Sequence, residues 1–347
     1  MSQMQIGLLL LGGLVLLGMF AYNSWQARKT RPRQAEPAPE LAPLLDREPT
    51  LSESDLQAMD LLEVDHLAIS AQEKKPLLDA LLDSVVPIAL DAPVSGEAVL
   101  AAMPSTRRVG SKPFSVDALN ASTGAWEFPQ SGARYTQLQA GLQLANRAGP
   151  INDIEFSEFV VKMQAFCDAF GGTPDFPDMR GEVSRSRELD QFASEHDAQL
   201  GFELRAKRAA WSPSYIQQMA AREGFVVGPM PGRLVLPAGT QGQPSLLSLS
   251  FDTQAALSDD LDQSALRTCT LALDVTHVAR EEQAFERMRT AARALAQSMD
   301  GALTDDRGMA LSDGALDQIA IDIEQLYDRL DQHGLPAGSS LARRLFA

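Results

Sequence analysis

The sequence is poor in the residues that carry most metal and nucleophilic chemistry. Its 347 residues include two cysteines, Cys167 and Cys269, and four widely spaced histidines. No histidine stands three or four positions from another histidine or a cysteine, the spacing that places two ligands on one helix face. Two cysteines cannot form a disulfide framework and are typical of a reducing compartment. We therefore expect no metal and no cofactor, and we expect each cysteine to be a small packed side chain.

The sequence also lacks the short motifs that hold nucleotides or catalytic zinc. It contains no P-loop, no G-x-G-x-x-G, no H-E-x-x-H and no paired C-x-x-C. Its acidic runs are typical of solvated loops and turns. We therefore expect a protein that is not an enzyme and has no small-molecule substrate.

Basic residues are scarce over most of the chain. The first 33 residues hold four of the 30 lysines and arginines and none of the 46 acidic residues, so the remaining chain carries a formal charge of −20. Nucleic-acid binding depends on clustered basic residues that neutralise phosphates. A sheet that reads RNA also needs exposed aromatic side chains on its central strands and a basic face. We therefore expect no nucleic-acid partner.

One long hydrophobic run is present, at residues 6–22 (I-G-L-L-L-L-G-G-L-V-L-L-G-M-F-A-Y). It carries no charge, and the four basic residues follow between positions 28 and 33. Seventeen helical residues span roughly 26 Å, which matches a bilayer core once the flanking apolar residues are added. Short flanks rich in lysine and arginine stay in the cytoplasm. The pattern predicts a transmembrane anchor over residues 1–29, with the N-terminus outside and the body in the cytoplasm.

Two other interpretations of residues 6–22 agree less well with the sequence. A secretory signal peptide needs a basic start and a small-residue cleavage site, but residues 1–5 hold no lysine or arginine and residues 20–24 contain no A-x-A. A buried helix of a soluble domain is rarely apolar on every face. We therefore expect residues 6–22 to contact membrane lipid as a single-pass helix.

The next segments connect this anchor to a folded body. Residues 30–54 are rich in proline and predict an extended, semi-rigid linker. Residues 55–83 contain leucines at helical spacing between positions 77 and 82, which predict a packing helix. From residue 84 onward short strands alternate with amphipathic helices. The clearest helix carries apolar residues at offsets 0, 3, 4, 7, 10 and 14 from Phe156.

The alternation of strands and helices occurs twice. R-G-E-V-S-R-S-R-E-L-D-Q-F from Arg180 matches R-G-M-A-L-S-D-G-A-L-D-Q-I from Arg307 at a constant spacing of 127 residues. We interpret residues 84–196 and 197–332 as two copies of one unit, followed by a tail at 333–347. The alternative is that two α/β segments share short words by chance.

The second unit contains motifs of a known family. G-F-V-V-G-P-M (224–230), P-S-L-L-S-L-S (244–250) and G-A-L-T-D-D-R-G-M-A-L-S (301–312) resemble segments of the ZipA family of bacterial cell-division proteins. The uncharged anchor, the basic flank and the proline-rich linker also resemble this family. The resemblance implies an α+β fold, in which helices cover one face of an antiparallel sheet. It also implies that the other face forms a shallow groove for the C-terminal tail of FtsZ, the tubulin-like division protein.

The resemblance also implies candidate groove residues. If Leu247, Leu249, Leu271 and Leu273 lie on the helix-covered face, their neighbours along the strands face the groove. The predicted groove is smaller and more polar than the resemblance implies. Its predicted residues are Met230, Leu234, Leu246, Ser248, Ser250 and Ala272. In the first unit, Trp126 and Tyr135 are predicted to be exposed and to offer a second binding surface.

The resemblance implies a membrane adaptor. Such a protein binds the C-terminal tail of FtsZ and tethers the Z-ring to the bacterial inner membrane during septum assembly. The alternative is a membrane-tethered scaffold of the same fold that binds another division or envelope protein.

Overall fold

The computed structural model describes most of the chain after the linker. The described residues are 33–35, 78–239, 243–258 and 260–347. The predicted anchor at 6–22 and most of the linker and of the 55–83 segment lie outside them. No helix within the described part of the chain has both the length and the hydrophobicity needed to cross a bilayer.

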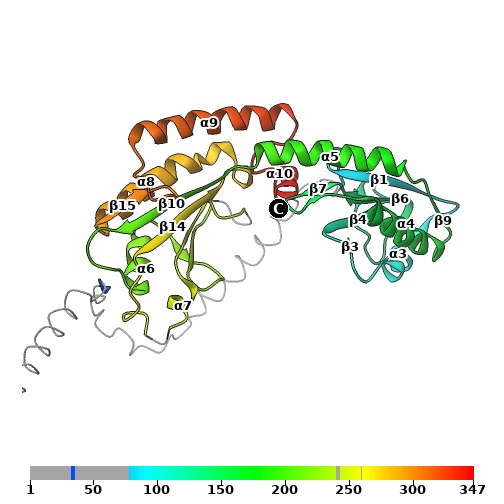
Figure 1. The fold of residues 1–347 in the computed structure, drawn as a ribbon. Coiled ribbons are helices and arrows are strands. Elements are labelled where there is room, and N and C mark those ends of the chain that lie inside the picture. Colours follow the sequence, from blue (N-terminus) through cyan, green and yellow to red (C-terminus); the bar gives the residue numbers. More distant parts are fainter. Residues whose placement is uncertain (1–32, 36–77, 240–242, 259) are drawn as a thin grey trace, which may run out of the picture. The chain divides into compact units, whose positions relative to one another are not determined.

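The described residues form two compact units. The first unit consists of residues 78–196 together with 344–347, and the second consists of residues 197–343 together with 33–35. Both units mix helices with antiparallel sheets, so the α+β class is confirmed. Figure 1 shows both units with their elements labelled.

The first unit is built on a sheet with the strand order β3-β4-β6-β1-β9, to which β2 and β5 add short edge pairs. The central pairs β4–β6, β6–β1 and β1–β9 are all antiparallel. The elements are β1 (Asp83–Leu90), β2 (Val94–Ser95), α3 (Gly96–Ala102), β3 (Arg108–Val109), β4 (Lys112–Asn120), β5 (Trp126–Glu127), β6 (Arg134–Gln143), β7 (Ala145–Asn146), β8 (Gly149–Pro150), α4 (Asp153–Asp168), β9 (Gly172–Pro174) and α5 (Met179–His196).

Local sequence explains where the main helix of the first unit begins and which face it buries. The Asn152 side chain accepts hydrogen bonds from the main-chain N–H groups of Ile154 and Glu155, and the Glu155 carboxylate accepts one from Asn152 N–H, so a capping box starts α4. The apolar stripe of α4 is buried, and Phe159 meets Phe114 of β4 with ring centroids 5.7 Å apart. The predicted helix is therefore confirmed, and it covers one face of the sheet.

The second unit is built on a six-stranded sheet with the order β11-β12-β13-β14-β10-β15, and its pairs are all antiparallel. The elements are β10 (Gln199–Ala206), α6 (Pro213–Arg222), β11 (Val226–Val227), β12 (Arg233–Leu236), β13 (Leu247–Ser250), α7 (Thr253–Ala256), β14 (Thr268–Asp274), the 3-10 turns η1 (Val275–His277) and η2 (Arg280–Glu282), α8 (Ala284–Ser298), β15 (Gly301–Thr304) and α9 (Asp313–Gln332).

Helices cover one face of this second sheet. Ser212 caps α6 and Pro213 occupies its first turn, as the sequence predicts. α8 packs on the sheet through Phe285, whose ring meets Phe202 of β10 at 6.2 Å, and α9 lies outside α8 (Figure 1). Alternate residues of β10, β13 and β14 are buried under these helices, and their neighbours are left on the opposite, open face.

The two sheets share the order of four successive strands. This order is β4-β6-β1-β9 in the first unit and β13-β14-β10-β15 in the second. Within the matching words, Leu189 of α5 and Leu316 of α9 are both buried. Arg180 lies inside α5, whereas Arg307 lies in the turn before α9, so only the second half of the words has the same conformation. That the units are tandem copies stays a prediction.

The prediction of a helix over residues 55–83 is wrong for its last residues, 78–83. Residues 78–82 form a turn, and β1 begins at Asp83. The Asp79 carboxylate accepts the main-chain N–H of Leu81 at 2.8 Å, and the Asp83 carboxylate accepts the N–H of Asp79 at 2.8 Å. Side chains that bond nearby main-chain groups compete with helix formation, so these two aspartates explain the turn. Residues 55–77 lie outside the described part of the chain.

The outermost described segments both belong to folded units. Arg33, from the predicted linker, pairs as an isolated bridge with Trp211 and forms an ion pair with Asp300 at 3.4 Å. The predicted tail contains a further helix, α10 (Ser340–Leu345). Its last residues lie in the first unit, where Leu345 and Phe346 are fully buried. The segment 333–347 is therefore structured over most of its length.

Candidate functional site

The open face of the second sheet has a floor of small side chains. The strand registers align Gly201, Ala272, Ser248 and Val235 in one row across β10, β14, β13 and β12. Val226 of the edge strand β11 continues the row next to Val235. Because Gly201, Ala272 and Ser248 are small, a partner can approach the main chain closely there, while the valines offer apolar contact at the other end of the row.

A second row runs parallel to the first and carries charge. It aligns Arg233, Ser250, Thr270 and Glu203. Arg205 forms an ion pair with Glu203 at 2.6 Å, which partly neutralises that end of the row. Arg233 is exposed at the other end. The open face therefore offers a row of small and apolar side chains beside a row of polar ones. Arg233 lies on β12, the strand that also carries Val235.

A cavity of about 260 Å³ lies at one end of this face. Asp274 lies at the polar end of the cavity. Its carboxylate accepts hydrogen bonds from Thr276 Oγ1 at 3.0 Å and from Gln199 Nε2 at 3.4 Å, and His277 Nδ1 lies 3.6 Å from it. The residues that line the cavity are Gln199, Leu200, Arg233, Pro244, Ser245, Leu246, Leu247, Ser248, Ala272, Leu273, Asp274 and His277.

The hairpin formed by β11 and β12 carries the exposed apolar side chains at the edge of the sheet. Val226, Val227 and Met230 are 50%, 73% and 51% exposed. Gly228 shapes the hairpin, because a Cβ there would lie 2.8 Å from the main-chain oxygen of Arg233. Three exposed apolar side chains within five residues are unusual for a solvent-facing edge and are typical of a contact surface.

Four of the six predicted groove residues lie where the sequence places them. Ser248, Ser250 and Ala272 are half-buried on the open face, and Met230 is exposed on the hairpin. Their role in binding a partner stays a prediction.

Leu234 and Leu246 do not offer surface to a partner, because each is only 2% exposed. Leu234 pairs with Leu249 and therefore shares the helix-covered face. Leu246 precedes β13 and is held by its N–H bond to Leu236 O at 2.8 Å. The prediction that their side chains are accessible is wrong.

Sequence reasoning missed the residues that replace them. Val235, one position from Leu234, lies on the open face opposite Ser248. Val226 stands in the same G-F-V-V-G-P-M motif as Met230, pairs with Val235 and is exposed together with Met230. The signal was present as the alternation along β12, since the buried Leu249 fixes the register of its neighbour.

Of the two residues predicted to form a second surface in the first unit, Trp126 is partly accessible and Tyr135 is not. Trp126 is half-buried and lines a hollow with Pro87, Gln137 and Gln139 on the open face of the first sheet. Tyr135 is fully buried, and its hydroxyl accepts the N–H of Gln130 at 2.8 Å and contacts Glu127 at 3.1 Å. The prediction that Tyr135 is exposed is wrong, because its ring is needed in the core and its hydroxyl finds partners there.

The two cysteines are packed side chains. Both are buried, and burial raises the pKa of each thiol to about 12. The thiolate, which is the nucleophilic form, is therefore negligible at neutral pH. Across the residues that the structure describes, no group of three or more His, Cys, Asp or Glu side chains has a metal-binding arrangement.

Comparison with known proteins identifies the second unit. Residues 214–321 match the family model for the ZipA, C-terminal FtsZ-binding domain. The match runs from α6 into α9 and contains the exposed hairpin and the open face of the sheet. A search of curated proteins found no match to the chain. The resemblance drawn from the motifs is confirmed over residues 214–321: this part of the second unit is similar to the ZipA C-terminal, FtsZ-binding domain.

Proposed function

We propose that the open face of the second sheet, with the β11–β12 hairpin, binds the C-terminal tail of FtsZ. The observation that carries the proposal is the position of Val226 and Met230. These exposed apolar residues lie within the matched segment and at the edge of the uncovered face. Apolar anchors that dock in a shallow groove are a general mode of peptide recognition.

The geometry suggests how such a tail is held. An apolar side chain of the peptide contacts Val226 and Met230, and the backbone lies over the floor formed by Ser248 and Ala272. The small side chains of this floor add little apolar area, so each contact at the hairpin carries a large share of the binding free energy. We therefore expect a moderate affinity that depends strongly on the hairpin.

The second part of the proposal is tethering. A transmembrane helix at residues 6–22 places the chain in the bacterial inner membrane, with the body in the cytoplasm, and the acidic body is repelled from anionic lipid. A membrane that holds many copies raises the local concentration of binding sites, so FtsZ filaments with many tails bind by avidity. In this way a moderate single-site affinity is enough to hold the Z-ring during septum assembly.

Reconstitution in vesicles tests both parts together. The full-length chain is inserted into lipid vesicles, and fluorescent FtsZ filaments are added. We expect filaments on vesicles that carry the chain, and none when FtsZ lacks its C-terminal tail. Equal recruitment with and without the tail would contradict tail binding. Recruitment by a chain in which a soluble tag replaces residues 6–22 would contradict tethering by the anchor.

The floor of the open face supports a second candidate. Gly201, Ala272 and Ser248 give the open face less apolar surface than we expect of an efficient FtsZ groove. A membrane-tethered scaffold that binds another division or envelope protein would have such a face. A pull-down with the full-length chain that recovers one defined protein and no FtsZ would select this function.

A further inference from the structure

The first unit contains a buried ion pair that joins distant parts of the chain. The Arg344 guanidinium meets the Asp83 carboxylate through both of its terminal nitrogens, with Nη1 3.0 Å from Oδ2. The Asp83 side chain is fully buried at the start of β1, and Arg344 is partly exposed. A paired guanidinium–carboxylate contact of this kind is geometrically specific for arginine.

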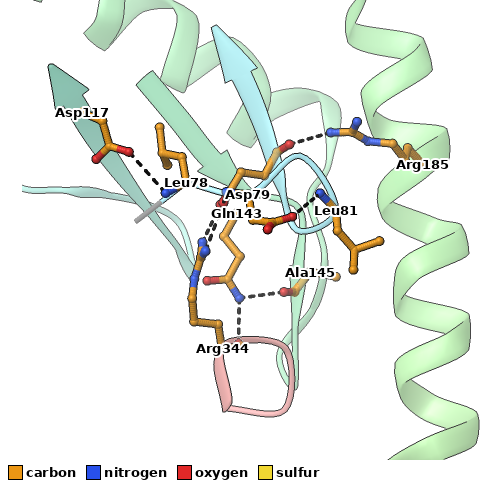
Figure 2. Close-up of polar contacts among 9 residues, drawn as sticks. Leu78, Asp79, Leu81, Asp117, Gln143, Ala145, Arg185 and Arg344 are labelled. Carbon is orange, nitrogen blue, oxygen red and sulfur yellow. Dashed lines mark hydrogen bonds and ion pairs between the residues drawn. The ribbon is translucent and has the colours of Figure 1, made fainter. Parts of the chain in front are cut away.

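The main chain around Arg344 is also held. Gln143 of β6 donates from Nε2 to the main-chain oxygen of Arg344 at 2.8 Å and to that of Ala145 at 2.8 Å (Figure 2). Arg147 N–H donates to the main-chain oxygen of Ala347 at 3.2 Å. The segment is therefore bound along its backbone as well as through its arginine, which is how short peptides are recognised.

Two apolar side chains complete the contact. Leu345 and Phe346 directly follow Arg344, belong with it to the first unit and are both fully buried. A charged anchor followed by two buried apolar anchors is the arrangement of a linear recognition motif, in which the apolar groups supply affinity and the charge supplies specificity.

The first sheet does not need this segment for its strand pairing. All pairs of its central strands join residues between Asp83 and Pro174, so the sheet is complete without residues 344–347. The segment therefore contributes side chains and main-chain hydrogen bonds to the unit, but no strand.

A second buried carboxyl group, that of Asp117, interacts electrostatically with this ion pair. Asp117 of β4 accepts the N–H of Leu78 through Oδ2 at 3.3 Å. The charge of Asp83 makes Asp117 harder to ionise and that of Arg344 makes it easier, so these groups interact.

We propose that the first unit is a peptide-binding module. Its ligand is a short segment in which an arginine is followed by two apolar residues, and this chain fills the site with its own residues 344–347. The proposal is independent of FtsZ binding, because the site lies in the first unit.

A trans-binding experiment tests the proposal. The chain without residues 344–347 is titrated with a fluorescent peptide of residues 339–347 (S-S-L-A-R-R-L-F-A), and binding is followed by anisotropy. We expect the peptide to bind the shortened chain saturably. We expect its affinity for the intact chain to be at least tenfold lower, because residues 344–347 already occupy the site there. Peptides with Arg344→Gln or Phe346→Ala should bind at least tenfold more weakly, whereas the matched Arg343→Gln peptide should bind like the original.

Equal binding to the shortened and intact chains, or equal loss with the Arg343→Gln and Arg344→Gln peptides, would overturn the proposal. So would no binding to a shortened chain that is folded. If the shortened chain does not fold, the full-length Phe346→Ala variant replaces it. Peptide that binds this variant at least tenfold more tightly than the intact chain supports the proposal, and peptide that does not overturns it.

Discussion

Asp83 and Arg344 are 261 positions apart in sequence, yet their side chains form the buried ion pair of the first unit. The carboxylate also accepts the Asp79 N–H, while the nearby Arg185 donates to the main-chain oxygen of Asp83 at 2.6 Å and leaves the carboxylate to Arg344. A buried charge that loses its partner destabilises a protein far more than a lost surface pair does. The stability of the first unit therefore depends on a residue that follows the second unit in the chain.

Replacement of Arg344 by alanine should destabilise the first unit by about 3 kcal/mol, because the buried Asp83 carboxylate loses its cation. Hydrogen–deuterium exchange of peptides from β1 and β6 measures this loss in the full-length chain. The matched Arg343→Ala variant removes the neighbouring arginine, which has no part in the pair, and should change exchange little. Equal effects of the two variants would show that the Asp83 contact contributes nothing.

The stability of the first unit should depend on the protonation of Asp117. Burial raises the pKa of this carboxyl above its ordinary value of 3.8. The folded state then binds the proton more tightly than the unfolded state, so this contribution to stability is complete below pH 3.8 and is lost as the pH rises through the folded pKa.

In an Asp117→Asn variant the side chain does not ionise, so the variant keeps this stability as the pH rises. The asparagine oxygen can still accept the N–H of Leu78. We therefore expect its free energy of unfolding, relative to the original chain, to be more favourable at pH 7 than at pH 3.5. Urea denaturation at the two pH values measures the difference. A difference that is constant with pH would be incompatible with the raised pKa.

Two neighbouring residues of β12 should separate stability from binding. Leu234 faces the core, so Leu234→Ala should cost about 2–5 kcal/mol of unfolding free energy. Val235 faces the open side, so Val235→Ala should cost less than about 1 kcal/mol and should weaken binding of the FtsZ tail. Denaturation and peptide titration of both variants provide the measurements. The reverse pattern would mean that β12 is one residue out of register.

Both thiols should resist modification in the folded chain. Burial raises the pKa of Cys167 and of Cys269 to about 12, so a thiol reagent at pH 8 meets neither an accessible group nor a thiolate. We expect no labelling of the native chain and two labels per chain in denaturant. Rapid labelling of one cysteine under native conditions would show that its environment opens, and would revive the question of a reactive thiol.

The sequence predicted the elements better than the site. Apolar periodicity was sufficient for α4, whose phenylalanines are buried, and Ser212-Pro213 was sufficient for the start of α6. Local patterns of this kind depend on neighbours in sequence. The open face was predicted correctly at Ser248 and Ala272. In β13 and β14, buried apolar residues alternate strictly with half-buried ones, so each strand has one covered and one open side.

The failures involve contacts that apolar periodicity does not encode. Leu234 was placed on the wrong face because its side follows from pairing with Leu249. The burial of Tyr135 depends on Glu127 and Gln130, which contact its hydroxyl across a turn. The docking of Arg344 could not be predicted, because nothing in the local sequence connects it with Asp83.

The most direct test of the account is a titration of the full-length chain, in mild detergent, with a peptide of the FtsZ C-terminal tail. The double variant Val226→Lys/Met230→Lys places two charges on the hairpin, and Ile321→Lys places one on the similarly exposed Ile321 of α9 as a control. The account predicts saturable binding that falls at least tenfold in the hairpin variant and stays unchanged in the control. No binding at hundreds of micromolar by the folded chain, or equal binding by all three proteins, would contradict it.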